Sequence, residues 1–102
     1  MNESPIYNQI FSQRLKQIRL AKGLSQKRLG ILAGIDEFVA STRINRYEKG
    51  VHQANIEVVQ QLSAVLEVPL AYFYTEDDDL ALLLLSWIKM DAEKKKSILA
   101  LI

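Results

Sequence analysis

A short stretch near the middle of the chain is dense in hydrogen-bonding side chains. Five of the six residues 41–46 are polar and none is acidic: Ser41, Thr42, Arg43, Asn45 and Arg46. Hydroxyl, amide and guanidinium groups can hydrogen-bond to base edges and phosphates. If residues 40–47 are helical, Ala40, Ile44 and Tyr47 recur on one side and point inward. Most of the polar set then faces outward, namely Ser41, Thr42, Asn45 and Arg46, which predicts a surface that reads nucleic acid.

The residues around this stretch predict the two helices that would present it. Gly23 reads as a helix stop, Ser25 starts a new helix, Gly34 turns the chain and Gly50 ends the second helix. Gly30 lies inside the first of these helices and costs about 1 kcal/mol relative to alanine, so we expect another helix to approach closely there. Gly34 is expected to adopt a positive φ. Two short helices joined by a glycine turn form a helix-turn-helix.

Apolar residues at helical spacing predict the other helices of an all-α fold. The first should open at Ser4-Pro5, run to about Ala21, and leave Arg14 and Lys16 toward solvent. A fourth helix should be capped by Asn55, and residues 70–74 should form a short fifth helix after Pro69. The residues expected to point inward are Ile10 or Phe11, Leu15 and Ile18; Leu29 with Leu32 or Ala33; and Ile56, Val59, Leu62, Val65 and Leu66.

Residues 75–102 are predicted to add two more helices. Thr75 and the four acids that follow it are expected to start a helix and not to form a calcium loop, because the alternating ligand spacing and central glycine of such a loop are missing. Residues 80–90 are apolar almost all round, Asp91 caps the last helix, and the sequence ends on Leu101-Ile102. Such an end should be docked on its own domain or on a partner. We favour a dimerisation hairpin through residues 80–102 over an intrachain lid.

The charge is divided unevenly between the two halves of the chain. Residues 1–50 contain nine Lys or Arg against four Asp or Glu, a net charge of +5, whereas residues 51–102 contain four Lys against eight acids, a net charge of −4. A basic half is the expected footprint of phosphate binding. The acidic half would be repelled by the same phosphates, so we expect it to face protein or water.

The composition limits the classes of function. A chain of 102 residues with 49% hydrophobic residues is expected to be one folded domain with a small appendage. The absence of cysteine excludes disulfides and thiolate sites, and His52 alone is not expected to bind a metal. No signal segment is recognisable, and the longest apolar run, residues 80–85, is far short of a membrane span. We expect a soluble cytoplasmic protein without cofactor, metal or membrane contact.

Three motifs in order carry a resemblance to a known family. They are RLKQIRLAKGLSQKRLG, RINRYEKG and NIEVVQQLSAVLEVPLAYFY, and together they lie within residues 14–74. This region resembles the Cro/repressor (XRE-like) helix-turn-helix domain, a five-helix DNA-binding unit of phage repressors and small bacterial regulators. The resemblance implies a repressor-like helix-turn-helix domain over residues 1–74, with residues 75–102 as a C-terminal two-helix extension, in a bacterial or phage-encoded protein associated with the nucleoid.

The resemblance also implies roles for single residues. Arg19 and Glu48 should form a partly buried ion pair between the first helix and the end of the third, and Gln26 should contact a phosphate or base edge while it braces the recognition helix. The base-reading set is then Gln26, Ser41, Thr42, Arg43, Asn45 and Arg46. The set expected to hold phosphates is Lys27, Lys49, His52 and Gln53. Which of the two arginines reads a base, and which holds a phosphate, stays open.

The sequence departs from the family in one place. Gly34 and Glu48 are fourteen residues apart, four more than the family usually has. The four residues 36–39 either add an N-terminal turn, capped by Asp36, to the recognition helix or form a longer loop before it. We favour the extended helix. The insertion shifts what reaches the groove first and puts Asp36 and Glu37 near where phosphates would lie.

These observations predict sequence-specific binding of double-stranded DNA by a small homodimeric transcriptional regulator, most simply a repressor of a palindromic operator. A variant is an antitoxin whose apolar C-terminal helices bind a toxin. A protein-interaction module that has lost DNA contact is less favoured, because the reading face is basic and polar. An enzyme is least favoured, because Ser41 has no histidine that could complete a triad.

Overall fold

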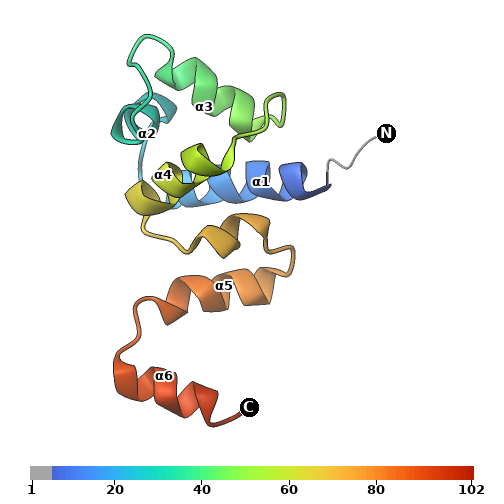
Figure 1. Ribbon diagram of the computed structural model, residues 1–102, viewed down its shortest axis with the longest axis vertical. Helices are drawn as coiled ribbons and strands as arrows, with labels where there is room; N and C mark the ends of the chain where they lie inside the picture. The colour runs from blue at the N-terminus through green and yellow to red at the C-terminus, as the bar shows by residue number, and fades with distance from the viewer. Residues whose placement is uncertain (1–5) are drawn as a thin grey trace.

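The computed structural model describes residues 6–102, and every regular element within them is helical (Figure 1). In chain order the elements are α1 (Ile6–Ala21), α2 (Gln26–Leu32), α3 (Ala40–Glu48), α4 (Ile56–Leu66), the 3₁₀ helix η1 (Leu70–Tyr74), α5 (Asp78–Trp87) and α6 (Ala92–Leu99). This arrangement confirms the predicted all-α fold of five helices with two more after them. The predicted start of the first helix at Ser4-Pro5 lies outside the described residues.

Side-chain caps set where most of the helices begin. Ser25 Oγ accepts from the Arg28 amide at 2.9 Å, and the Asn55 and Asp91 side chains accept from the third residue of α4 and α6, as predicted. The prediction that Thr75 caps α5 is wrong. Asp77 does so, accepting from Leu80 N at 3.0 Å, whereas the Thr75 hydroxyl turns back to the Ala71 carbonyl at 2.6 Å.

α1 runs across the middle of the molecule and divides it into two parts (Figure 1). The pair α2–α3 packs on one side of it and η1 on the other, with α5 beyond η1. The core between them holds Phe11, Leu15, Ile18, Leu29, Ile44, Val59, Leu62, Leu66, Tyr72 and Phe73. Ile10 and Phe11 are both buried, and Ala33 is buried in preference to Leu32. Ile56 was expected inside but is 49% exposed, because the first turn of α4 extends past the core.

Gly30 and Gly34 allow α2 and α3 to cross closely. A Cβ on Gly30 would lie 2.7 Å from the Ala40 Cβ and 3.0 Å from the Ala40 carbonyl oxygen, so a side chain there would push the start of α3 away. Gly34 has φ +89°, a conformation that L side chains rarely adopt. Both predictions about these glycines are confirmed.

Arg14 lies inside the molecule and not toward solvent, which corrects the sequence prediction. Its guanidinium donates to the Thr75 carbonyl from Nε at 3.0 Å and from Nη2 at 2.8 Å, and to the Glu76 carbonyl at 3.1 Å. Nη2 also lies 3.0 Å from the Asp78 carboxylate. The reason is position, since Arg14 stands one turn from both Ile10 and Ile18 on the buried side of α1. Arg14 therefore ties the start of the C-terminal extension to α1.

The ring of Tyr72 completes the site around Arg14. The guanidinium carbon lies 5.7 Å from the ring centroid, a cation–π distance. Burial raises the pKa of Tyr72 above its ordinary value, Arg14 opposes this shift, and Asp78 adds to it. The phenol is neutral near pH 7 even at the ordinary pKa of tyrosine, so the ring meets the guanidinium as a π surface.

The C-terminal helices bury little of themselves. Ala81 is the buried residue of α5, and α6 has none. Leu101 and Ile102 are 86% and 99% exposed, whereas Ala81, Leu84 and Leu85 of α5 pack in or against the core. The contact between the two helices includes Lys95 Nζ over the Trp87 ring at 5.5 Å. Within residues 6–102 no helix combines the length and apolar character that crossing a bilayer requires.

We predict that Arg14→Ala lowers the free energy of unfolding by about 1.5–3 kcal/mol, because hydrogen bonds from a charged donor contribute about that much. Urea denaturation measures the change. Lys16→Ala is the matched control, since Lys16 is an exposed cation on the same helix and should shift stability by no more than about 0.5 kcal/mol. Equal effects of the two variants would contradict the anchoring role of Arg14.

Candidate nucleic-acid interface

α3 begins at Ala40, and residues 36–39 form a separate turn before it. The favoured prediction of an extended recognition helix is therefore wrong. Asp36 accepts twice in this turn, from Phe38 N on its carboxylate at 2.8 Å and from Val39 N on its carbonyl at 3.0 Å. A side chain that bonds its own backbone two residues on competes with helix formation, and Val39, with ψ −1° and φ −120°, is outside the helical region.

The inward face of α3 is the one that the spacing predicted, but the outward set differs by two residues, because Asn45 was expected outward and Arg43 was not in that set. Ala40, Ile44 and Tyr47 are buried. On the opposite side Ser41, Thr42, Arg43 and Arg46 are exposed, while Asn45 is half-buried between the two faces. Burial of three apolar side chains at i, i+4 and i+7 fixes the rotation of the helix about its axis, and this rotation presents the hydroxyl and guanidinium groups to solvent.

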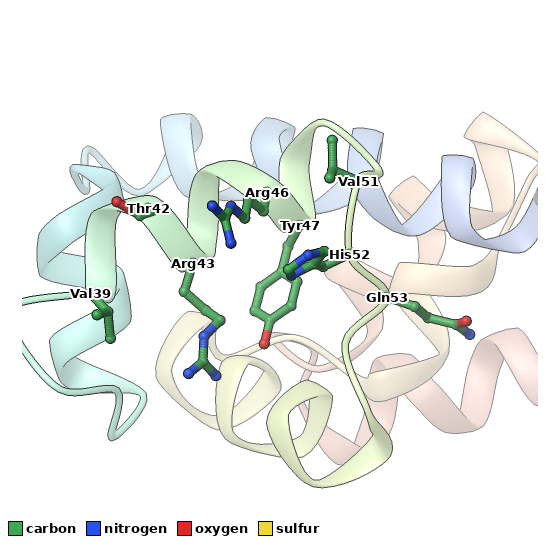
Figure 2. A pocket seen from close by; sticks show the side chains of 8 residues that line it. All are labelled: Val39, Thr42, Arg43, Arg46, Tyr47, Val51, His52 and Gln53. Carbon is green, nitrogen blue, oxygen red and sulfur yellow. The ribbon is translucent and has the colours of Figure 1, made fainter.

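A broad concavity of about 750 Å³ lies along this outward face (Figure 2). Its lining comes from α3 and from the loop that follows it: Val39, Thr42, Arg43, Arg46, Tyr47, Val51, His52 and Gln53. Two guanidinium groups and no carboxylate line it, so it attracts anions. Of the other residues predicted to hold phosphates, Lys49 is exposed at the C-terminal end of α3 and Lys27 is exposed on α2.

A buried ion pair joins α1 to the end of α3. Arg19 Nε lies 2.5 Å from Glu48 Oε2, and Nη2 lies 3.1 Å from Oε1, with side-chain exposures of 9% and 3%. The remaining Arg19 nitrogen donates to the Leu24 carbonyl at 2.9 Å. This is the pair that the resemblance implies, and its bidentate geometry fixes both side chains.

Gln26 extends the ion pair to α2. Its Nε2 donates to Glu48 Oε1 at 3.0 Å, and the residue is half-buried. The structure therefore places Gln26 as a brace between α2 and α3, while Ser41, Thr42, Arg43 and Arg46 form the outward face without it. The amide nitrogen faces the carboxylate, which leaves the amide oxygen as the acceptor available to a ligand.

Two further polar residues of α1 hold the same C-terminal end of α3, and sequence reasoning missed both. Ser12 Oγ donates to the Tyr47 carbonyl at 2.6 Å, and Asn8 Nδ2 donates to the Gly50 carbonyl at 3.1 Å. The Tyr47 carbonyl also accepts from Gly50 N at 3.2 Å, so Ser12 gives it a second donor, and Asn8 binds the chain just past the end of α3. The sequence did contain a signal for these two residues. Ser12 is next to the apolar Phe11 and one turn from Asn8, so both lie near the buried side of α1.

The described residues contain no group of three His, Cys, Asp or Glu side chains arranged to hold a metal ion. The acids of residues 76–79 lie at the start of α5, where Asp77 caps the helix and Asp78 faces Arg14. The concavity along α3, lined by Arg43 and Arg46, is suited to a polyanion.

Comparison with known proteins assigns the central part of the chain. A model of the helix-turn-helix family matches residues 15–73. The crystal structure of transcriptional regulator BswR is similar, with a TM-score of 0.83 and 44% sequence identity over 88% of this chain and 89% of that one. Two uncharacterized HTH-type transcriptional regulators, from Sinorhizobium medicae (strain WSM419) and Rhizobium meliloti (strain 1021), are each 32% identical over 63 residues. This match spans 62% of the chain but only 42% of either relative.

We predict that Glu48→Ala lowers the free energy of unfolding by about 3–5 kcal/mol, because it leaves the buried Arg19 guanidinium without its counter-charge. Gln26→Ala should cost less, about 1–2 kcal/mol, because it removes a single hydrogen bond to a charged group. Chemical denaturation of the two variants beside the wild type measures both. If the Glu48→Ala protein were as stable as Gln26→Ala, the prediction would be wrong. The Arg19 guanidinium would then be hydrated when Glu48 is removed.

Proposed function

Since the chain belongs to the helix-turn-helix family in its XRE-like form, we propose that it is a homodimeric repressor of transcription that binds a palindromic operator through α3. The observation that carries the proposal is the outward face of α3, a polar and cationic ridge whose rotation and position are both fixed by buried contacts. The relatives have bacterial sources, so the DNA concerned would be that of a bacterial nucleoid in the cytoplasm.

The major groove of double-stranded DNA admits one helix, and the face of α3 has the groups that read it. Ser41 and Thr42 can donate to or accept from any base edge, and Asn45 can pair with adenine. Arg43 and Arg46 each suit guanine or a phosphate. Gln26, Ser41, Thr42, Arg43, Asn45 and Arg46 are the proposed base-reading residues, with Gln26 acting through its amide oxygen or through the position that it gives α3.

The proposed phosphate contacts surround this ridge. Lys49, His52 and Gln53 follow α3 directly, and the last two line the concavity beside Arg46. Lys27 is exposed on α2. Groups on both flanks of a recognition helix can contact the phosphates that border the groove, which sets the register of the helix without reading sequence.

Dimerisation through residues 80–102 is supported by the surface of the last two helices. Leu82 is 63% exposed, Leu83 43% and Leu99 56%, and large apolar side chains of this kind are suited to a protein contact. The charges there also complement a second copy. Acids gather at the start of α5 and Lys94, Lys95 and Lys96 lie on α6, so a two-fold dimer in which α5 of each copy faces α6 of the other would pair acids with lysines.

Such a dimer matches the symmetry of a palindrome. Each copy would place one α3 in a major groove on the same face of the duplex, with half-sites about 34–36 Å apart. The acidic surface at the dimer contact would lie away from the phosphates. Occupation of a promoter in this way blocks transcription, which is why we propose repression.

We predict that Arg43→Ala and Arg46→Ala each lower operator affinity by about 1–3 kcal/mol, which is about fivefold to 150-fold. Fluorescence anisotropy with operator duplexes measures this loss, and repetition at several salt concentrations separates the roles. Replacing an arginine that holds a phosphate should lower the slope of log affinity against log salt concentration by about one. Replacing an arginine that reads a base should instead change the order of affinities for mutated operators. Lys16→Ala on α1 is the control, and unchanged affinity in both arginine variants would favour a protein-interaction module.

We predict that Leu82→Glu converts the dimer to a monomer, because it places a charge in the centre of the proposed contact, and that operator affinity falls on the order of a hundredfold as the two half-sites lose their linkage. Sedimentation equilibrium measures the mass. Leu20→Glu is the matched control, since Leu20 is 58% exposed on α1 and should leave the dimer intact. A wild-type monomer would instead assign the surface to another protein, such as a toxin.

A further inference from the structure

Phe38 is the most exposed aromatic side chain in residues 6–102, at 88% exposure. It belongs to the turn of residues 36–39, the insertion that separates this chain from the usual spacing of its family. A large apolar ring so open to water gains little from the fold of the monomer. Exposure of one such ring is common on protein surfaces, so what distinguishes Phe38 is its place beside the outward face of α3.

The turn holds Phe38 in a defined place. Phe38 N donates to the Asp36 carboxylate at 2.8 Å, Val39 N donates to the Asp36 carbonyl at 3.0 Å, and Arg43 N donates to the Val39 carbonyl at 2.8 Å. These bonds join the turn to the first turn of α3. A ring on so constrained a backbone loses little conformational freedom when it binds.

The Asp36 carboxylate is oriented by the backbone of its own turn, since it accepts from Phe38 N. Asp36 and Glu37 both keep their negative charge, which repels phosphates. The apolar ring of Phe38 is therefore the group of this turn that is suited to a base edge and not to the DNA backbone.

The neighbours of Phe38 point to the groove as its partner. Val39, the next residue, lines the concavity with Thr42 and Arg43 (Figure 2). The connection between α2 and α3 also lies at the end of the molecule opposite α6 (Figure 1). Phe38 is therefore separate from the proposed dimer surface and directly N-terminal to the proposed reading face.

We propose that Phe38 is a specificity-determining residue that packs against the C5-methyl group of a thymine in the major groove. The inference rests on the proposed function, because it requires α3 to dock in that groove. The thymine methyl is the one apolar group that the base pairs present there. Phe38 and Val39 then read thymine beside the polar positions that read the adjacent bases, and the insertion adds a base step to the recognised half-site.

The test uses the full-length protein and begins with selection of its operator from a pool of random duplexes. Each thymine of the selected operator is then replaced in turn by uracil, which removes the C5-methyl and leaves every hydrogen-bonding group of the base. Affinities of the wild type, Phe38→Ala and Phe38→Leu are measured on each duplex. Circular dichroism confirms that the variants fold, as expected for a side chain with so little burial.

For the wild type we expect one or two uracil positions in each half-site to lower affinity about fourfold, the value of one buried methyl group. Phe38→Ala should bind the thymine operator about fourfold more weakly and show no loss at those uracil positions. Phe38→Leu keeps an apolar group and should retain most of the discrimination.

Three results would overturn the inference while the proposed function stands: a Phe38→Ala protein with wild-type affinity, one with the wild-type uracil profile, or a wild type that tolerates uracil everywhere. The last of these, combined with a loss in Phe38→Ala, would mean that the ring contacts sugar or phosphate. Failure of the wild type to select any operator would overturn the proposed function and this inference with it.

Discussion

The buried contact between Arg19 and Glu48 is the interaction on which the outward face of α3 depends. Glu48 lies at the last position of α3 and is almost wholly removed from water, with both oxygens engaged by Arg19 and one of them also by Gln26. Taking two charges out of water is costly, so the pair is tolerable only with full hydrogen bonding. That requirement fixes the end of α3 relative to both α1 and α2. Ser12 and Asn8 add neutral bonds to the same end.

The N-terminal end of α3 is positioned by close packing against α2. Ala40 approaches Gly30 so closely that no Cβ fits between them, and the hydrogen-bonded turn of residues 36–39 leads the chain to that point. A helix held by polar bonds at one end and by close packing at the other has little freedom to rotate or slide. Its outward side chains are thereby pre-organised, which lowers the entropy lost when they meet a ligand.

The molecule separates its two proposed contacts by charge and by position. The arginines of α3 line its outward concavity, while exposed leucines lie on α5 and α6, with acids at the start of α5 and lysines on α6. Arg14 connects the two regions, because its guanidinium binds the backbone of the link between η1 and α5. A cation from the basic half therefore orients the acidic half, and Tyr72 packs over it as a neutral ring.

The sequence by itself determined the all-α class, the caps at Ser25, Asn55 and Asp91, the two glycines of the helix-turn-helix, and the inward side of α3, because these follow from periodicity and from bonds within a few residues. The Arg19–Glu48 pair was accessible only through the family resemblance. The tertiary structure alone decided that Arg14 is buried, that Asn8 and Ser12 hold α3, and that residues 36–39 form a turn with Phe38 at its tip. Arg14, Asn8 and Ser12 bind backbone carbonyls of distant segments, and the turn forms because the Asp36 carboxylate competes locally with the helix. Spacing along the chain encodes neither outcome.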